Sequence, residues 1–256
     1  MPELLEVEAY RTILEPTIGA TIASVTADAL VCGATPNPCP AIGQKISGVR
    51  RHGKLLLVDL GVHTIGIHAR MTGTICVDGV SPFPKLRYAP STSDKRFVRL
   101  SATLDDGRVI DLHDPRRLAR VTVDPDVSGL GPDASVINAV QVERVLGTGT
   151  SPVALKTRLL DQSRIAGLGN LLVDEVCFQA RLDPSRPATS LTSEERTSLA
   201  KQIPRTLRQL GKRGGSDMGA LQEFRHRGAN CPRCGAPLRR ATVGGRTTLW
   251  CSVEQV

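Results

Sequence analysis

The chain has 256 residues and a formal net charge of +8, which suggests one large domain or two of medium size and a polyanionic partner. Only 3% of residues are aromatic, which argues against a protein that reads single strands by stacking bases and favours a duplex gripped through its phosphates. No stretch approaches the roughly 18 apolar residues of a membrane span, and the acidic N-terminus is unlike a signal peptide, so we expect a cytoplasmic protein.

The basic charge is concentrated near the C-terminus. Residues 201–256 carry eleven Lys and Arg against three acids, while residues 1–200 carry twenty-two of each. The chain also has seven cysteines, which in a cytoplasmic protein are thiols or metal ligands rather than disulfides. Four of them show no ligand spacing and are predicted to be structural: Cys32, Cys39, Cys76 and Cys177.

The chain opens with MPELLEVEAYR, in which apolar residues recur at helical spacing up to Leu14. This pattern predicts an amphipathic helix over residues 3–14 with Pro2 as a favoured first-turn residue, and an ordinary packing helix would explain it. Five predicted strand segments follow, and a turn at Asp105, Asp106 and Gly107 joins the last two: 21–28, 45–60, 63–73, 97–104 and 108–114. An all-β region of this kind is a sandwich or a barrel.

Three loops of this region carry basic side chains. RRHGK at 50–54 precedes an apolar strand, and protection of a sheet edge by charge is the plain alternative to a binding role. RMTG at 70–73 and DPRRL at 114–118 each place arginine beside a large apolar residue, Met71 in one and Leu118 in the other. Apolar wedges beside arginines are typical of proteins that push into a base stack and hold a duplex kinked.

Residues 123–152 are rich in Gly, Pro and Asp and read as a linker with a short helix over 136–146. Further helices are predicted over 153–161, 168–180 and 192–211, the last beginning with a capping box of Thr192 and Glu195. The GLGN turn before the second of these exposes helix-start amides beside Asn170, which suits a phosphate, although the glycines could equally serve helix packing.

The last thirty residues form a small unit of their own. CPRC at 231–234 is followed after sixteen residues by Cys251, which predicts thiolates gathered around tetrahedral zinc. Glu254 stands where a fourth cysteine is expected, and a carboxylate, a water molecule or His226 could complete the site. A metal-free hairpin is the alternative. Arg246 follows the glycine pair of VGGRTT, a hairpin tip that lets a backbone approach a phosphate, although a solvated basic face would look the same.

Together these motifs resemble the formamidopyrimidine-DNA glycosylase and endonuclease VIII family of bifunctional base-excision repair enzymes. The resemblance spans nearly the whole chain and includes MPELLEVE, RRHGK, HARMTG, DPRR, SRIAGLGNLLVDE, and CPRC with GGRTTLWC. It implies an α+β multidomain protein: an N-terminal β-sandwich at 1–123, a helix-two-turn-helix domain at 124–227 and a zinc-finger-like β-hairpin at 228–256. It further implies a monomer, associated with the nucleoid, that binds damaged double-stranded DNA.

The resemblance also implies roles for individual residues. Removal of Met1 would expose the amine of Pro2, whose reference pKa of about 7.7–8.0 leaves part of it neutral and able to attack C1′ of the damaged nucleotide. Glu3 resembles the general acid and Glu6 an orienting carboxylate, while Lys54 resembles a lysine that binds phosphate and assists elimination. The resemblance also implies the remaining DNA contacts. Asn170 and Arg246 would clamp the phosphate beside the lesion, and Arg246 would also serve the final elimination. The space left by the extruded base would be filled by Met71, Arg116 and Leu118, and further phosphates would be contacted by His68 and Lys156.

The sequence departs from the family pattern at four places. Leu5 replaces a usual proline, Leu118 replaces a usual phenylalanine, and Glu254 replaces the fourth of the zinc ligands, so the predicted metal set is Cys231, Cys234, Cys251 and Glu254. The segment from Arg213 to Cys231 lacks the long loop that covers 8-oxoguanine in typical members, so lesion preference does not transfer. A catalytically silent relative that binds damaged or abasic duplex is the competing hypothesis.

Overall fold

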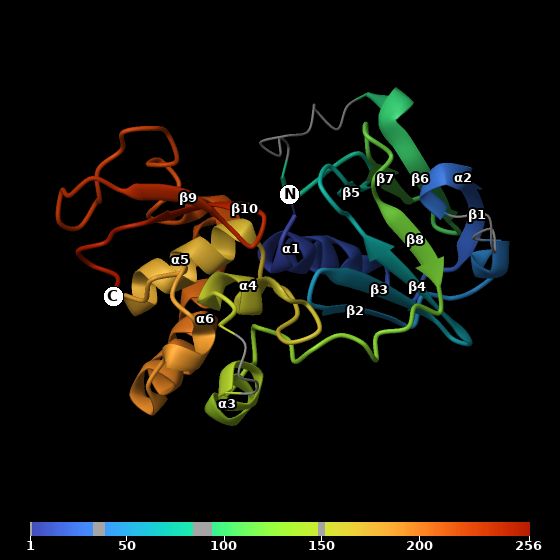
Figure 1. Ribbon diagram of the computed structural model, residues 1–256. Coiled ribbons are helices and arrows are strands. Elements are labelled where there is room, and N and C mark those ends of the chain that lie inside the picture. The colour runs from blue at the N-terminus through green and yellow to red at the C-terminus, as the bar shows by residue number, and fades with distance from the viewer. Residues whose placement is uncertain (1, 33–38, 84–93, 148–151) are drawn as a thin grey trace. The chain divides into compact units, whose positions relative to one another are not determined.

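The first of two units in the computed structural model is a sandwich of two antiparallel sheets (Figure 1). The structure describes residues 2–32, 39–83, 94–147 and 152–256, and it divides into the units Met1–Ser128 and Gly129–Val256. Met1, whose removal was predicted, lies outside the described residues, as do residues 148–151 of the predicted linker. The second unit contains both the helices and the C-terminal hairpin for which separate domains were predicted.

Each sheet of the first unit has four strands, in the orders β2-β3-β4-β8 and β1-β6-β7-β5. The strands are β1 (Ile22–Ala27), β2 (Gly48–His52), β3 (Leu55–Leu60), β4 (His63–His68), β5 (Thr74–Val77), β6 (Val98–Leu104), β7 (Val109–His113) and β8 (Arg120–Val123). Short helical segments connect them: α2 (Ala29–Cys32), η1 (Glu15–Thr17), η2 (Cys39–Ala41) and η3 (Lys95–Phe97). The predicted sandwich is confirmed, and so is the hairpin turn, where Gly107 has a φ of +89°.

The core of the first unit lies between the sheets because apolar residues alternate along the strands. Leu56 and Val58 of β3 are buried against Leu100, Ala102 and their neighbours from the other sheet. Helix α1 (Leu4–Leu14) contacts β2 and β3 of one sheet and β5 of the other. It buries a stripe of four large side chains, each contributing about 1.5–3 kcal/mol: Leu4, Val7, Tyr10 and Leu14. The beginning of the chain is therefore fixed to both sheets.

The second unit is helical up to its C-terminal hairpin (Figure 1). Its helices are α3 (Ala139–Gly147), α4 (Leu155–Leu160), α5 (Asn170–Ala180) and α6 (Ser193–Arg213), with the short η4 (Ala188–Ser190) and η5 (Ser216–Met218). The capping box at α6 is confirmed, since the Glu195 amide donates to the Thr192 hydroxyl at 3.2 Å and the Thr192 amide donates to the Glu195 carboxylate at 2.8 Å. None of the helices in the described ranges is long and apolar enough to cross a membrane.

The hairpin of the second unit consists of β9 (Arg239–Val243) and β10 (Arg246–Trp250). Its base packs on α5 through a small apolar cluster of Phe178, Leu221, Cys231 and Cys251. The guanidinium of Arg233 adds to this contact, because it lies 3.9 Å from the centre of the Phe178 ring and donates to the Phe178 carbonyl at 2.8 Å. The hairpin is thus attached to the helix that begins at Asn170.

Candidate active site and nucleic-acid interface

Pro2 and Glu3 lie at the N-terminus of α1. Pro2 and Glu3 are both buried, and Glu3 is the residue that caps the helix. Its backbone N–H donates to the Glu6 carboxylate at 2.8 Å, which places a negative charge at the positive end of the helix. Glu6 therefore fixes the backbone at Glu3, next to Pro2, and its role as an orienting carboxylate stays a prediction.

The turn that carries Lys54 is bound to the same helix. The guanidinium of Arg51 is only 8% exposed, and it donates to the Glu8 carboxylate at 2.9 Å and to the Gly53 carbonyl at 3.0 Å. Burial opposes ionisation of Glu8, but hydrogen bonds from Arg11 and Arg51 outweigh it and hold the pKa of Glu8 below its usual value. Glu8 and Arg51 were not predicted as site residues. Together they connect α1 to the turn of Lys54.

A second turn attached to α1 presents Met71, whose side chain is 41% exposed. The Tyr10 hydroxyl donates to the Gly73 carbonyl at 3.3 Å, and the Gly73 amide donates to the Ala69 carbonyl at 2.9 Å. A Cβ at position 73 would lie 2.5 Å from the Ala69 oxygen, which is closer than real side chains come. Glycine is therefore required for this turn to close.

The loop that follows β7 meets the Met71 turn through a buried carboxylate. Asp114 is fully buried and accepts hydrogen bonds from the Thr72 hydroxyl and from the Ala119 amide, the latter at 2.6 Å. On the surface the Arg116 guanidinium donates to the Met71 sulfur at 3.7 Å. The two loops predicted separately as wedges are thus brought together, and Asp114 is the positioning residue that sequence reasoning missed.

Other residues of this loop differ in exposure. Leu118 is half-buried, whereas Arg116 is exposed. The adjacent Arg117 is turned to Asp28, whose carboxylate accepts its hydrogen bond at 2.7 Å. Arg116 is therefore the arginine of DPRR that lies next to Met71.

His68 ends β4 directly opposite Leu55, the residue after Lys54. Its Nδ1 accepts a hydrogen bond from the Arg70 amide at 3.1 Å, which leaves the proton of the neutral ring on Nε2. Burial, together with the charges of Arg70 and Lys54, lowers the pKa of His68 to about 4. The imidazole is therefore neutral at physiological pH and could offer a phosphate a single N–H donor.

In the second unit, Asn170 is the first residue of α5 and follows a tightly organised turn. The Gln162 amide donates to the carbonyls of Leu160 and Leu168 at 2.8 and 2.9 Å, and its oxygen accepts from the Gly167 amide at 3.0 Å. Asn170 Oδ1 is buried with no hydrogen-bond partner among the described residues. Asn170 therefore begins a helix at the positive end of its dipole, and its side-chain oxygen is a buried acceptor without a partner among the described residues.

The position of Lys156 corrects the prediction of a phosphate contact. Its side chain is 0% exposed, and its Nζ lies 2.6 Å from the equally buried Asp174 carboxylate and 3.2 Å from the Thr247 carbonyl. Arg225 donates to the same carboxylate at 2.7 Å and to the same carbonyl at 3.3 Å. Burial lowers the pKa of Lys156 and raises that of Asp174, and their attraction opposes both shifts. Lys156 therefore positions the strand beside Arg246.

The tip of the β9–β10 hairpin packs against Thr157 of α4. Gly244 has a φ of +57°, and a Cβ there would lie 2.6 Å from the Thr157 hydroxyl oxygen. Arg246 follows the tip with its side chain exposed, while the next residue, Thr247, is held by the buried charges. An exposed guanidinium on a fixed strand is suited to binding an anion such as phosphate.

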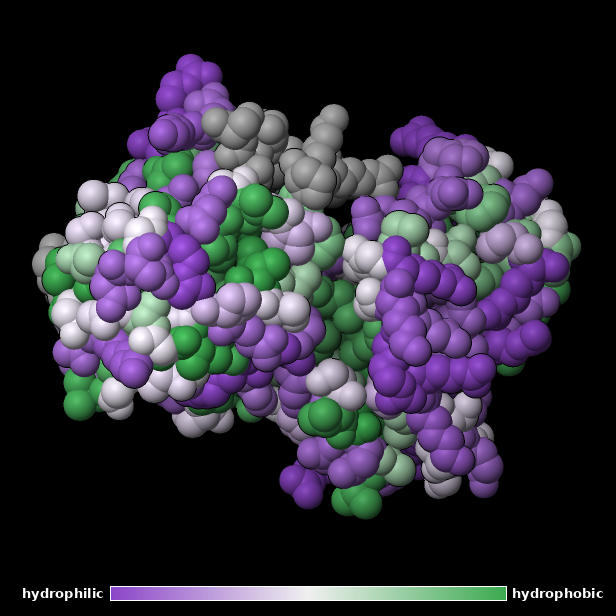
Figure 2. Space-filling model, turned by 180° about the vertical axis from the view of Figure 1, so that it is seen from behind, coloured by the Kyte–Doolittle hydropathy of each residue, from purple (hydrophilic) through white to green (hydrophobic). Residues whose placement is uncertain are grey.

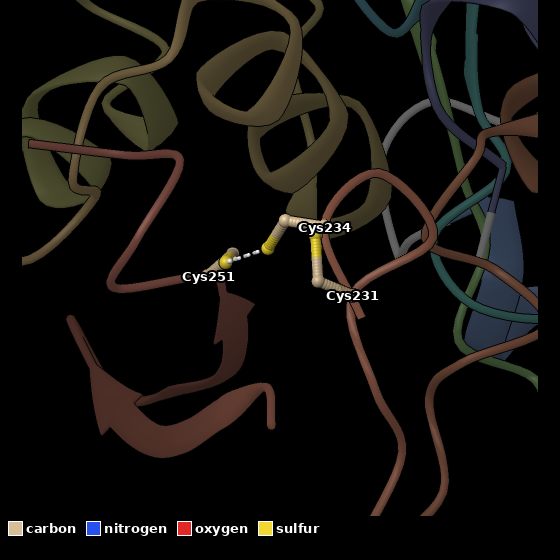
Figure 3. A group of neighbouring side chains, drawn as sticks. All are labelled: Cys231, Cys234 and Cys251. Atoms are coloured by element: carbon tan, nitrogen blue, oxygen red, sulfur yellow. Dashed lines mark hydrogen bonds between the residues drawn. The ribbon is translucent and has the colours of Figure 1, made fainter. Parts of the chain in front are cut away.

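Three predicted zinc ligands lie together at the base of the hairpin (Figure 3). The Sγ atoms of Cys231, Cys234 and Cys251 lie within 4.8 Å of one another, and those of Cys234 and Cys251 are 3.5 Å apart. Zinc bound at about 2.3 Å in a tetrahedron needs sulfurs about 3.8 Å apart, so the three thiols fit the metal. Within the part of the chain that the structure describes, neither Glu254 nor His226 joins this group.

Glu254 is instead engaged with α5. Its carboxylate lies 3.2 Å from the guanidinium of Arg181, the left-handed residue that ends the helix. Ligation by Glu254 would require this carboxylate to leave Arg181, and it stays a prediction. His226 Nδ1 lies 3.2 Å from the carbonyl of Arg227.

The chain matches two family profiles. They are described as the formamidopyrimidine-DNA glycosylase N-terminal domain, over residues 1–121, and the formamidopyrimidine-DNA glycosylase H2TH domain, over residues 130–220. Among curated relatives, the formamidopyrimidine-DNA glycosylase of Roseiflexus sp. is 34% identical over 98% of both chains, and that of Laribacter hongkongensis is 31% identical over the full length of both.

Solved structures agree with these matches. The MutM (Fpg) protein of Thermus thermophilus superposes with a TM-score of 0.80 at 31% identity, covering 99% of this chain and 98% of that one. The Lactococcus lactis Fpg, crystallised with DNA containing an oxidized pyrimidine, superposes with a TM-score of 0.81 at 28% identity and covers 99% of both chains. Two domain profiles, full-length relatives and a shared fold establish that the chain belongs to the formamidopyrimidine-DNA glycosylase family.

Proposed function

We propose that this chain, a base-excision repair enzyme with DNA glycosylase and abasic-site lyase activity, uses Pro2 as its nucleophile and the residues around α1 as its catalytic group. One observation carries this assignment. Helix α1 follows directly after Pro2 and Glu3, and it is hydrogen-bonded, through Arg51 and Tyr10, to the turns of Lys54 and Met71. Residues far apart in the sequence are therefore held by one rigid element, as catalysis by positioning requires.

The chemistry follows from the secondary amine. The neutral Pro2 nitrogen attacks C1′ of an extruded nucleotide, the bond to the oxidised base breaks, and Glu3 supplies a proton to the ring oxygen or the departing group. The nitrogen then loses its proton and the C1′–O4′ bond breaks, with O4′ leaving as a protonated hydroxyl, to give an iminium ion. Its fixed positive charge withdraws electrons and acidifies the C2′ proton. Loss of that proton expels the 3′ phosphate and cleaves the strand, with Lys54 assisting the proton transfer.

The second unit supplies the grip on the sugar-phosphate strand. Asn170 at the N-terminus of α5 and Arg246 on the fixed hairpin are the two groups proposed to bind the phosphate beside the lesion, and Arg246 would also serve the final elimination. Met71, Arg116 and Leu118 would fill the space that the extruded base leaves, with His68 donating to a phosphate nearby. Damaged duplex DNA is the proposed partner. That the protein is a monomer, located in the cytoplasm and associated with the nucleoid, stays a prediction.

Zinc would stabilise the hairpin. Cys231, Cys234 and Cys251 would hold it as thiolates, and when bound the metal would tie the CPRC turn to the end of β10. Metal analysis of the purified chain, with the variants Cys251→Ser and Glu254→Gln, tests this assignment. We expect one zinc per chain, lost with Cys251→Ser, and loss with Glu254→Gln would identify the carboxylate as fourth ligand.

Borohydride trapping on abasic duplex DNA tests the nucleophile. The processed chain should form a covalent adduct, and a chain whose N-terminus carries one additional residue should form none, because its proline nitrogen is an amide. Glu3→Gln should still be trapped on abasic DNA while excising intact lesions at least 100-fold more slowly. An undiminished adduct from the extended chain would refute the role of Pro2.

One panel of duplexes determines the lesion class. It should carry 8-oxoguanine, a ring-opened purine, an oxidised pyrimidine and an abasic site, each at the same position of one sequence. The ratio of kcat/KM between lesions then measures specificity independently of overall activity. We expect excision of at least one oxidised base, and cleavage of the abasic duplex alone would reduce the assignment to a lyase.

A further inference from the structure

A row of cations runs along the solvent face of α6 and takes no part in the site described above. Lys201, Arg205, Arg208 and Lys212 are all exposed, and their spacing of four, three and four residues places them on one face of the helix. We call these four residues the α6 stripe. In the view of Figure 2, hydrophilic residues cover a broad area of the surface of the second unit.

The α6 stripe faces away from the rest of the second unit. The opposite face of the helix buries Leu199, Ile203, Leu207 and Leu210, and α6 packs on α3 and α5. The stripe therefore belongs to a surface other than the one formed by the start of α5 and the hairpin tip.

No carboxylate neutralises the stripe in the part of the chain that the structure describes. None of the ion pairs found there includes any of its four residues, although the same helix pairs Arg196 with Glu143 and Glu195 with Arg186 near its beginning. Like charges at this spacing destabilise a helix. The helix dipole favours cations only in the last turn, so it accounts for Lys212 and not for Lys201 or Arg205.

The dimensions of the stripe fit a phosphate backbone. Eleven residues of α-helix separate its ends by about 16 Å, a length over which one strand of duplex DNA presents about five phosphates. Aromatic side chains are missing from residues 201–212, so stacking on single-stranded bases is excluded. The apolar face is buried in the protein, which leaves no surface to insert into a membrane.

We propose that the α6 stripe is a second, sequence-independent contact for the phosphates of duplex DNA. It would hold a segment of DNA other than the one that contains the lesion. A protein with two such contacts can pass from one duplex segment to another while it searches. The proposal rests on the binding of damaged duplex proposed above, and it adds a site to it.

The test uses the full chain with its first site already filled. A short duplex containing an uncleavable abasic analogue is bound at one equivalent, and a second, undamaged duplex carrying a fluorophore is then titrated. The wild-type chain should bind the second duplex, and raising the salt from 50 to 200 mM should weaken that binding about 100-fold, as four phosphate contacts require. The variant K201Q/R205Q/R208Q/K212Q should lose at least tenfold in affinity at 50 mM salt.

A matched variant controls for net charge. K45Q/K95Q/R96Q/R108Q removes two lysines and two arginines, as many as in the stripe, from the first unit. This variant should bind the second duplex with an affinity within twofold of wild type. Both variants should cleave the short abasic duplex at the wild-type rate, so a failure of the first site is seen separately. Failure of the wild-type chain to bind the second duplex, or equal binding by both variants, would overturn the proposal. Tighter binding of a polyglutamate peptide than of duplex at the stripe would also overturn it.

Discussion

The two units hold their candidate site residues by different means. In the first unit, the turn of Met71 is closed by the backbone hydrogen bond and close approach of Gly73 to Ala69, and Asp114 joins it to the loop of Arg116. In the second, Lys156 and Arg225 both pair with the buried Asp174 and both donate to the Thr247 carbonyl, which fixes the strand of Arg246. The difference predicts that the second unit is sensitive to the loss of a single charge and the first to the addition of a single methyl group.

The largest effect is expected from Asp174→Ala. It leaves the ammonium of Lys156 and the guanidinium of Arg225 without their buried partner, which should destabilise the second unit by about 3–5 kcal/mol. The fluorescence of Trp250, the single tryptophan of the chain, reports this unit during unfolding in urea. Glu143→Gln removes an exposed partner of Arg196 and should cost less than about 1 kcal/mol. Equal losses would show that burial of the charge is unimportant.

Gly73→Ala is the corresponding change in the first unit. The added Cβ meets a backbone oxygen, which cannot move aside as a side chain can, so we expect a loss of about 3 kcal/mol and displacement of Met71. Calorimetry of the full chain measures the stability, and affinity for a lesion duplex measures the displacement. Gly129→Ala is the control, because a Cβ there meets nothing within 4 Å. If both variants melt alike, the turn is not tightly closed.

The stability of the first unit should depend on pH through His68. The pKa of His68 is about 4 in the folded chain and about 6.5 in the unfolded chain, so the unfolded chain binds the proton first as the pH falls. Above pH 6.5 His68 is neutral in both the folded and the unfolded chain, so it does not reduce the free energy of unfolding. Between pH 6.5 and 4 the unfolded chain binds a proton at His68 that the folded chain does not, so the free energy of unfolding falls. Between pH 8 and pH 5 the wild-type chain should lose about 1–2 kcal/mol more than His68→Gln. Identical pH profiles would mean that His68 titrates normally.

The smallest effect concerns the contact between the hairpin and α5. Arg233→Met removes a cation from the face of Phe178 and should cost about 1 kcal/mol, measured by Trp250 fluorescence in urea. Arg239→Met changes an exposed arginine of β9 and should leave the midpoint unchanged. A larger loss from Arg239 than from Arg233 would contradict the packing described here.

Much of the fold was predictable because its signals are local. The stripe of α1, the hairpin turn before β7 and the capping box of α6 each depend on residues within a few positions of one another, and all three are confirmed. Residues 45–60 were predicted as one strand segment and instead form the two strands β2 and β3. The strands β5 and β8 were not predicted. Each has only four residues, too few to establish an alternation of apolar and polar side chains.

The site was less predictable because its contacts join distant residues. The partner of Lys156 is Asp174, 18 positions away, and the second donor to that carboxylate is Arg225, another 51 positions on. From sequence alone a lysine before a glycine-rich turn looks like an exposed phosphate ligand, and only packing reveals that it is buried. Asp114 was likewise part of a motif valued for its arginines, although its carboxylate joins the two loops.

Helix α1 also limits the motion of Pro2 and Glu3 at its N-terminus. The first residues of a domain usually fray, and their amide protons then exchange with solvent within seconds. Here Val7, Tyr10 and Leu14 of one helix face lie in the core of the sandwich, so the helix can open only when this core is disrupted. The amides of α1 should therefore be among the slowest to exchange in the first unit, and a nucleophile at its tip would meet each substrate from the same fixed position.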